Sequence, residues 1–155
     1  MKNHKNIKVL FLDVDGTMTD GKIHISQEGE LFKSFSVKDG YAINHILAEK
    51  EIVPIVITGR ESSIVQIRCR EIGITELYQG ISNKREKMME IMERIGVSLM
   101  ECSYMGDDLN DYECMNMVAL RGCPKDAARE IIEISDFVSN RCGGEGAVRE
   151  FVEWL

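Results

Sequence analysis

The chain has 155 residues, 44% hydrophobic and 29% charged, which is the composition of a folded globular protein and excludes a disordered one. This length is typical of one domain. The net charge of −7 argues against the basic surface of a nucleic-acid-binding protein, so an anionic ligand would need cations and backbone N–H groups gathered in one place.

The first third of the chain predicts a strand, a hairpin and a helix. The apolar run Ile7–Leu12 is typical of a buried strand. Two alternating segments, Lys22–Ser26 and Glu30–Ser36, flank a short turn that ends at Gly29, which favours a hairpin. Apolar residues at helical spacing then predict a helix over about Asp39–Lys50.

The middle of the chain continues this alternation of strands and helices. Ile52–Ile57 predicts a strongly apolar strand, and Ser62–Ile72 a helix that stops at Gly73. A short strand at Leu77–Tyr78 precedes a helix over Lys84–Ile95. The residues of this last helix that share one face, and that we expect in the core, are Met88, Ile91, Met92 and Ile95.

The last third predicts short elements. We expect strands at Cys102–Met105, Val118–Leu120 and Phe137–Val138, a helix at Tyr112–Met117, and another from Pro124 to about Ile132, since proline suits a first helical turn. A final helix follows a glycine-rich loop, and its inward residues are Val148, Phe151, Val152 and Leu155. Strands alternating with helices predict an α/β fold with a mostly parallel sheet. We expect one domain over residues 1–155, with the hairpin at about residues 22–36.

The cysteines and the apolar runs bear on the compartment. There are five cysteines, and no two form a C-x-x-C pair, so we expect free, mostly buried thiols rather than disulfides or a zinc site. The apolar run before Asp13 is too short for a secretory signal, and no stretch approaches the length of a membrane span. We therefore expect a cytoplasmic protein without a nucleic-acid or membrane partner.

Four polar clusters each follow an apolar segment. They are Asp13 with Asp15, the tripeptide Thr58–Arg60, Lys84, and Asp107 with Asp108. Ligands of open parallel sheets bind beyond the carboxyl ends of the strands, where segments far apart in sequence converge. We therefore expect these clusters to form one site.

The residue types in this predicted site suit phosphoryl transfer. Two carboxylates placed side by side repel unless a cation lies between them, and Mg²⁺ prefers oxygen ligands. Asp13 can attack phosphorus, and Asp15 can protonate the leaving oxygen and later activate water. The Thr58 hydroxyl, the Gly59 N–H and the Lys84 ammonium can hold the phosphate.

The motifs resemble those of the haloacid dehalogenase superfamily, and more narrowly those of the 3-deoxy-D-manno-octulosonate 8-phosphate (KDO 8-phosphate) phosphatase family. The superfamily likeness lies in Asp13-Val14-Asp15-Gly16-Thr17-Met18-Thr19-Asp20-Gly21, Ile57-Thr58-Gly59-Arg60, Lys84 and Gly106-Asp107-Asp108. The narrower likeness lies in Lys38-Asp39-Gly40-Tyr41, Leu77-Tyr78-Gln79-Gly80 and Gly143-Gly144-Glu145-Gly146-Ala147-Val148-Arg149-Glu150. The resemblance covers nearly the whole chain.

The resemblance implies a role for each matching residue. Asp13 is expected to be the nucleophile and a ligand of Mg²⁺, and Asp15 the general acid/base, whose backbone carbonyl also binds the metal. Asp107 completes the metal ligands, while Thr58, Gly59 and Lys84 hold the phosphate. Further substrate contacts are implied at Lys38, Asp39, Gly40, Arg60, Arg68 and Asn110.

Alternatives remain open for the substrate and the activity. Glu145 departs from many members of the family and also occurs in relatives that act on nine-carbon sugar acids, such as KDN or sialate 9-phosphate, whereas Arg60 favours the eight-carbon substrate. A non-enzymatic alternative is an assembly module, which is the role of a similar domain fused behind sugar-acid cytidylyltransferases. A response-regulator receiver also uses aspartates, a threonine and a lysine, but there the lysine comes last, whereas here Asp107 follows Lys84.

The intervals between the motifs leave no room for a cap domain. The hairpin and one helix fill the stretch between Asp15 and Thr58, and one helix and a short strand fill that between Thr58 and Lys84. The resemblance implies a homo-oligomer, a tetramer as in this family, with a C-terminal segment that can reach an adjacent site. We expect the ring of hairpins to bury Ile23, Ile25, Phe32 and Phe35.

Overall fold

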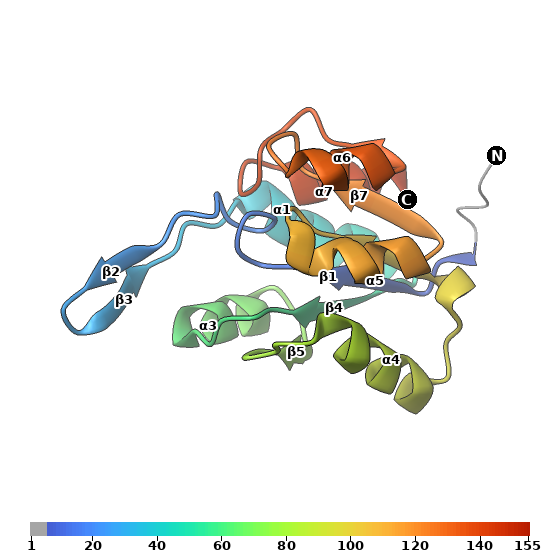
Figure 1. The fold of residues 1–155 in the computed structure, drawn as a ribbon, viewed down its shortest axis with the longest axis horizontal. Coiled ribbons are helices and arrows are strands. Elements are labelled where there is room, and N and C mark those ends of the chain that lie inside the picture. Colours follow the sequence, from blue (N-terminus) through green and yellow to red (C-terminus); the bar gives the residue numbers. More distant parts are fainter. Residues whose placement is uncertain (1–5) are drawn as a thin grey trace.

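The computed structural model describes residues 6–155 and confirms an α/β fold built on a parallel sheet (Figure 1). Each neighbouring pair of strands in the six-stranded sheet is parallel, and the strand order is β5-β4-β1-β6-β7-β8. The strands are β1 (Val9–Leu12), β4 (Val53–Ile57), β5 (Glu76–Tyr78), β6 (Cys102–Met105), β7 (Leu120–Cys123) and β8 (Phe137–Val138). Counted along the chain within the sheet, this order is 3-2-1-4-5-6, which is that of dinucleotide-binding α/β folds and differs from the 2-1-3-4-5 order of receiver domains.

Helices cover both faces of the sheet and enclose one core cluster on each side. The helices on one face are α1 (Val37–Tyr41), a π-helical turn (Ala42–Ile46), α2 (Leu47–Glu49), α3 (Ser63–Glu71) and α7 (Ala147–Trp154). Those on the other face are α4 (Lys84–Ile95), α5 (Tyr112–Met117) and α6 (Arg129–Ile134). Two short 3₁₀ turns, Leu99–Glu101 and Leu109–Asp111, flank β6.

The central strand β1 has apolar side chains on both faces. Leu10 and Leu12 point into the core beneath α1, α3 and α7, while Val9 and Phe11 point into the core beneath α4 and α5. All four are buried, because a central parallel strand has helices above and below it. This packing fixes the position of Asp13, the residue that follows β1.

Two predicted elements near the end of the chain were displaced. The strand expected at Val118–Leu120 begins only at Leu120, because the Ala119 N–H donates to the carbonyl oxygens of Leu99 and Cys102 instead of joining the ladder. The helix expected from Pro124 begins at Arg129. Pro124 instead opens a turn, in which its carbonyl oxygen accepts from the Ala127 N–H.

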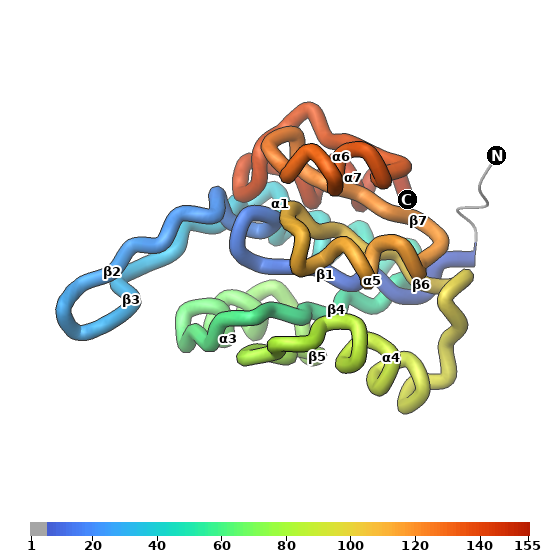
Figure 2. The backbone as a smooth tube through the Cα atoms, viewed as in Figure 1, coloured from blue at the N-terminus to red at the C-terminus, as the bar shows by residue number. Residues whose placement is uncertain are grey.

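The predicted hairpin is present and projects away from the body of the molecule (Figure 2). Its antiparallel strands, β2 (His24–Ser26) and β3 (Gly29–Phe32), are shorter than expected. The His24 and Phe32 rings stack across it with centroids 4.1 Å apart. Phe35, which we expected the ring of hairpins to bury, instead packs against the core of its own chain beneath the Arg68 guanidinium.

The last helix, α7, is part of the core. Val148, Phe151 and Val152 are fully buried, as predicted, and Leu155 is 8% exposed. The segment 147–155 therefore packs against its own chain, and a C-terminal segment that reaches an adjacent site stays a prediction.

The remaining expectations concern the thiols and membrane spans. The cysteines are free, and four of the five are buried. Across residues 6–155, every helix is too short or too polar to span a lipid bilayer.

Candidate active site

The site begins where the strand order reverses. From β1 the chain continues to β4 and β5 on one side of the sheet and returns to β6 on the other. Asp13 follows β1 directly, and Asp107 follows β6 after one glycine. The Asp13 N–H donates to the Met105 carbonyl oxygen at 3.1 Å, which joins the two strand ends. A crevice at such a switch point is where α/β folds bind their ligands.

A buried ion cluster lies beneath this crevice. Lys84, in the first turn of α4, places Nζ 2.7 Å from Asp13 Oδ1 and 2.8 Å from Asp111 Oδ1. The Tyr104 hydroxyl donates to the same Asp111 oxygen at 2.8 Å. The side chains of Lys84, Asp13 and Asp111 are 3%, 6% and 0% exposed. Lys84, the third predicted cluster, therefore contacts the first cluster at Asp13, the predicted nucleophile.

Negative charge exceeds positive charge in this cluster. Burial and the Asp111 charge raise the pKa of Asp13, although Lys84 opposes this, and burial together with Asp13 and Asp111 raises the pKa of Asp107. Burial alone would lower the pKa of Lys84, but its two carboxylate partners outweigh that effect and raise it. The Lys84 ammonium thus offsets only part of the negative charge of Asp13, Asp107 and Asp111.

These carboxylates are suited to a divalent cation. Asp13, Asp107 and Asp111 each offer an oxygen, and the three oxygens lie within 4.8 Å of one another. An all-oxygen set with unneutralised charge matches the preference of Mg²⁺ for hard ligands. The candidate metal ligands are therefore Asp13 and Asp107, which the sequence predicted, and Asp111, which it did not.

Two glycines let the loops approach these carboxylates closely. Gly16 has a positive φ of 94°, and a Cβ there would lie 1.9 Å from Asp107 Oδ2. A Cβ on Gly106 would lie 2.4 Å from the Asp111 carboxyl carbon. The neighbouring Thr17 hydroxyl donates to Asp107 Oδ1 at 3.2 Å, so the loop after Asp15 closes over Asp107.

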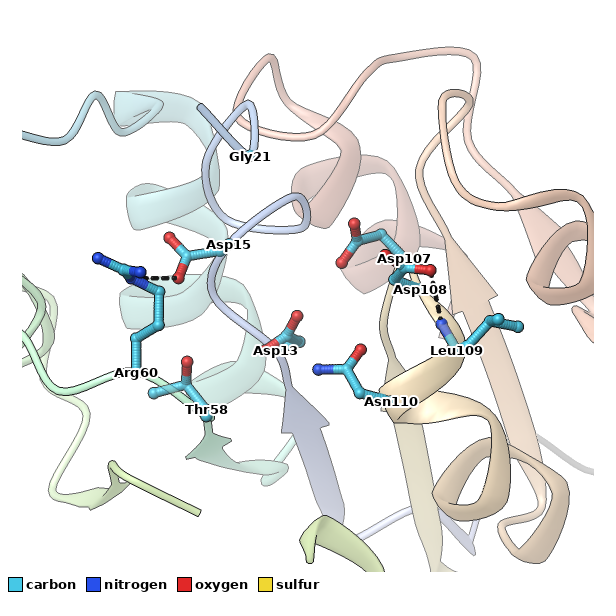
Figure 3. A pocket seen from close by; sticks show the side chains of 10 residues that line it. Asp13, Asp15, Gly21, Thr58, Arg60, Asp107, Asp108, Leu109 and Asn110 are labelled. Atoms are coloured by element: carbon cyan, nitrogen blue, oxygen red, sulfur yellow. Dashed lines mark hydrogen bonds and ion pairs between the residues drawn. The ribbon is translucent and has the colours of Figure 1, made fainter. Parts of the chain in front are cut away.

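An open cavity of about 550 Å³ lies above the cluster (Figure 3). Thr58 is almost fully buried at its edge, whereas the Arg60 side chain is 49% exposed. The residues that line the cavity are Asp13, Asp15, Gly21, Thr58, Gly59, Arg60, Asp107, Asp108, Leu109 and Asn110. The predicted residues Thr58, Gly59, Arg60 and Asn110 thus face the same space as the aspartates.

The Asp15 side chain lies apart from the other carboxylates. It points toward Arg60 rather than toward Asp13 and Asp107 (Figure 3), with Oδ2 3.9 Å from Arg60 Nε. Its Oδ1 lies 2.5 Å from Lys33 Nζ. The carboxylate of Asp15 therefore does not belong to the metal-binding group, and a ligand from Asp15 would have to be its backbone carbonyl, as the resemblance implied.

Four other predicted substrate residues do not line the cavity. Lys38 is exposed on α1. Asp39 accepts a hydrogen bond from the Arg149 N–H at 2.9 Å, and burial raises its pKa to about 6. Gly40 leaves room for Arg68, which donates to the Ser36 carbonyl oxygen at 3.3 Å. Within one chain Asp39 connects α1 to α7 and Arg68 connects α3 to the start of α1. A role in substrate binding stays a prediction for all four residues.

The sequence reasoning missed Asp111. The spacing in the sequence could have indicated it, because Asp111 lies four residues after Asp107. A 3₁₀ turn brings Asp111 back beneath the strand end. Its Oδ2 accepts from the Asp107 N–H at 3.2 Å. An aspartate one helical turn beyond a strand-end aspartate could have been recognised as a candidate.

Comparison with known proteins gives both a family and close relatives. Residues 46–150 match the haloacid dehalogenase-like hydrolase family. The 3-deoxy-D-manno-octulosonate 8-phosphate phosphatase of Escherichia coli (strain K12) is 41% identical over 151 residues, which are 97% of this chain and 80% of that protein.

Solved structures of such phosphatases share the fold. The enzyme from Yersinia pestis has a TM-score of 0.91 and 38% identity, covering 96% of this chain and 80% of its own. The enzyme from Moraxella catarrhalis, solved with a magnesium ion, a phosphate ion and a KDO molecule, has a TM-score of 0.92 and 34% identity. That alignment covers 97% of this chain and 86% of the other.

Proposed function

Because the chain belongs to the haloacid dehalogenase-like hydrolase family, we propose that it is a magnesium-dependent phosphatase that converts 3-deoxy-D-manno-octulosonate 8-phosphate to KDO and phosphate. The observation that carries this proposal is the position of Asp13, which Lys84 holds at the switch point of the sheet and which faces the open cavity. The identity of 41% to phosphatases of this substrate, over 97% of the chain, supports the choice of sugar. Phosphate release from a panel of eight- and nine-carbon sugar-acid phosphates tests it.

The first chemical step uses Asp13 and Asp15. An Asp13 oxygen forms a bond to phosphorus while the bond from phosphorus to the sugar oxygen breaks. The electron pair stays on the sugar oxygen, which takes a proton from Asp15. The Thr58 hydroxyl and the Gly59 N–H at the cavity edge donate to the equatorial phosphate oxygens.

The second step returns the enzyme to its starting state. Asp15, now ionised, removes a proton from water, which attacks phosphorus and releases Asp13 and inorganic phosphate. Lys84 stays charged and within 2.7 Å of Asp13, so it holds this carboxylate in one orientation throughout. When bound by Asp13, Asp107 and Asp111, Mg²⁺ supplies positive charge for the phosphate oxygens.

The other activities have less support. The relatives named above act on the eight-carbon compound, which argues against the nine-carbon substrates that Glu145 left open. Asp13, Asp15 and Asp107 are all present at the cavity, which argues against a purely structural assembly module. The strand order differs from that of a receiver domain.

Arg60 offers a test of the sugar-acid assignment. Its half-exposed guanidinium lies at the cavity, and a planar fork can bind a carboxylate through two hydrogen bonds. We expect Arg60→Ala to lower kcat/KM about 10- to 100-fold for KDO 8-phosphate, the value of a charged hydrogen-bonded pair, and much less for an aryl phosphate. Steady-state kinetics on both substrates measures the difference.

Arg60→Lys is the matched control for this prediction, because it keeps the charge and loses the fork. It should recover only part of the loss on the sugar-acid phosphate. Equal losses on both substrates in Arg60→Ala would show that Arg60 serves the phosphate or the Asp15 carboxylate instead.

We further propose that the single phosphatase domain works as a cytoplasmic homo-oligomer, a tetramer in which hairpins pair. The free thiols suit a reducing compartment. The hairpin exposes several apolar side chains, and an isolated two-stranded ribbon is only marginally stable. These side chains and their exposed fractions are Ile25 67%, Leu31 60%, Phe32 46% and Ile23 41%.

Replacing Ile25 by a charged residue tests the role of the hairpin in assembly. Ile25→Glu would place a charge in the buried interface, and we expect it to shift the protein toward monomers in sedimentation at micromolar concentration. Ile67→Glu on α3, where the isoleucine is 63% exposed, is the matched control and should keep the oligomer. A wild-type protein that sediments as an active 17.6 kDa monomer would end this proposal.

A further inference from the structure

Lys33 is buried although it lies at the base of a projecting hairpin. Its side chain is only 2% exposed. The ammonium lies between two carboxylates, 2.5 Å from Asp15 Oδ1 and 3.0 Å from Glu30 Oε1. The hairpin thus contributes a cation to the residue that we assign as the general acid/base.

Glu30 is in turn tied to the body of the domain. Its Oε2 accepts a short hydrogen bond from the Ser62 hydroxyl. Ser62 caps α3, where its hydroxyl accepts from the Val65 N–H at 3.3 Å, and its own N–H donates to Gln79 Oε1 at 2.9 Å. Lys33 is therefore held by a chain of contacts that ends on α3, the helix following the Thr58–Arg60 loop.

The charges around Asp15 favour one orientation of its carboxylate. Burial alone would lower the pKa of Lys33, but the contacts with Asp15 and Glu30 outweigh burial and raise it, so Lys33 stays charged. Lys33 holds Oδ1, while Oδ2 points toward Arg60 and the cavity. Without the ammonium, the half-buried carboxylate would be free to turn about its side-chain bonds.

We propose that Lys33 is a positioning residue that fixes Asp15 so that Oδ2 meets the oxygen of the leaving group, with Glu30 and Ser62 as its support. This inference rests on the proposed function, because it assigns a residue that acts through the acid/base of that reaction. It also gives the hairpin a role within its own chain, separate from any contact between subunits.

The choice of leaving group distinguishes a misplaced Asp15 from a folding defect. As the phosphorus–oxygen bond breaks, a sugar alkoxide is a poor leaving group and needs the proton of Asp15, whereas a nitrophenolate leaves without one. The ratio kcat/KM covers the steps up to departure of the leaving group. A misplaced Asp15 therefore lowers kcat/KM more for a sugar phosphate than for p-nitrophenyl phosphate. A general loss of folding would lower kcat/KM equally for both.

The decisive experiment measures kcat/KM of Lys33→Met on KDO 8-phosphate and on p-nitrophenyl phosphate. We expect a loss of about 10²-fold on the sugar phosphate, the typical cost of a small misplacement, and a much smaller loss on the aryl ester. Lys33→Arg should recover a large part of the difference, and Glu30→Gln should show a weaker loss with the same selectivity. Lys22→Met, an exposed lysine of the same hairpin, is the matched control and should behave as wild type.

The outcomes separate this inference from the proposed function. A wild-type protein without Mg²⁺-dependent activity on KDO 8-phosphate would refute the function. An active wild type whose Lys33→Met variant loses equally on both esters, or on neither, would overturn the role of Lys33. If Lys33→Met does not fold, Glu30→Gln carries the same comparison, and an equal loss of kcat/KM on both esters in that variant overturns the role of Lys33 too.

Discussion

Replacing Asp13 with Asn should lower kcat by more than about 10³-fold, as expected when the nucleophile itself is lost. The amide is a poor nucleophile toward phosphorus and a poor ligand for Mg²⁺. It would also leave the buried Lys84 with only Asp111 as an anionic partner. Steady-state turnover of KDO 8-phosphate measures the loss, and thermal unfolding checks that the variant is folded.

Asp20→Asn is the matched control for this prediction. It makes the same chemical change in the same loop, at a side chain that is 38% exposed and pairs with the surface residue Lys22. Its turnover should equal that of wild type. An Asp13→Asn variant that keeps more than a few per cent of activity would refute the covalent mechanism.

Removing the divalent cation should abolish turnover, and Mg²⁺ should restore it. Asp13, Asp107 and Asp111 gather three oxygens within 4.8 Å with one lysine to balance them, so the site needs further positive charge to hold a phosphate. Titration with a chelator and then with Mg²⁺ measures this dependence. Full activity in excess chelator would contradict it.

The same cluster predicts how pH affects stability without metal. In the folded protein the pKa values of Asp13 and Asp107 are raised, chiefly by burial, so in the pH range above their ordinary value near 4 the folded state binds more protons than the unfolded state. Stability contributed by these protonated groups is therefore lost as the pH rises. We expect the melting temperature of the metal-free protein to fall between about pH 5 and about pH 8.

Mg²⁺ should reverse this loss of stability, because it neutralises the ionised carboxylates and binds the folded state only. Its stabilising effect should be larger at about pH 8 than at about pH 5, where protons compete for the same oxygens. Asp107→Asn is expected to weaken both the pH dependence and the effect of Mg²⁺. A stabilisation by Mg²⁺ that is equal at both pH values would place the cation elsewhere.

Much of the fold followed from local patterns in the sequence. Local patterns predicted α4, α5, β6 and β8 with the bounds that the structure has. In α4 the reason is plain, because Met88, Ile91 and Met92 share one buried face whose spacing is fixed by the helix itself. The elements that shifted are β7 and α6, because hydrogen bonds to distant residues decide where they begin. An example is the Ala128 N–H, which donates to the Asp107 carbonyl oxygen just before α6 starts.

The sequence alone also pointed to the candidate site, whereas only the tertiary structure shows how its residues are arranged. Polar residues at strand ends identified Asp13, Thr58, Lys84 and Asp107, because the carboxyl ends of parallel strands meet at one edge. Asp111 and Lys33 were not identified. The spacing to Asp107 could have marked Asp111 as a candidate, but its ion pair with Lys84, like that of Lys33 with Asp15, is visible only in the folded chain. Spacing along the chain specifies which side chains share a face, but the partner of a buried charge depends on how the loops pack.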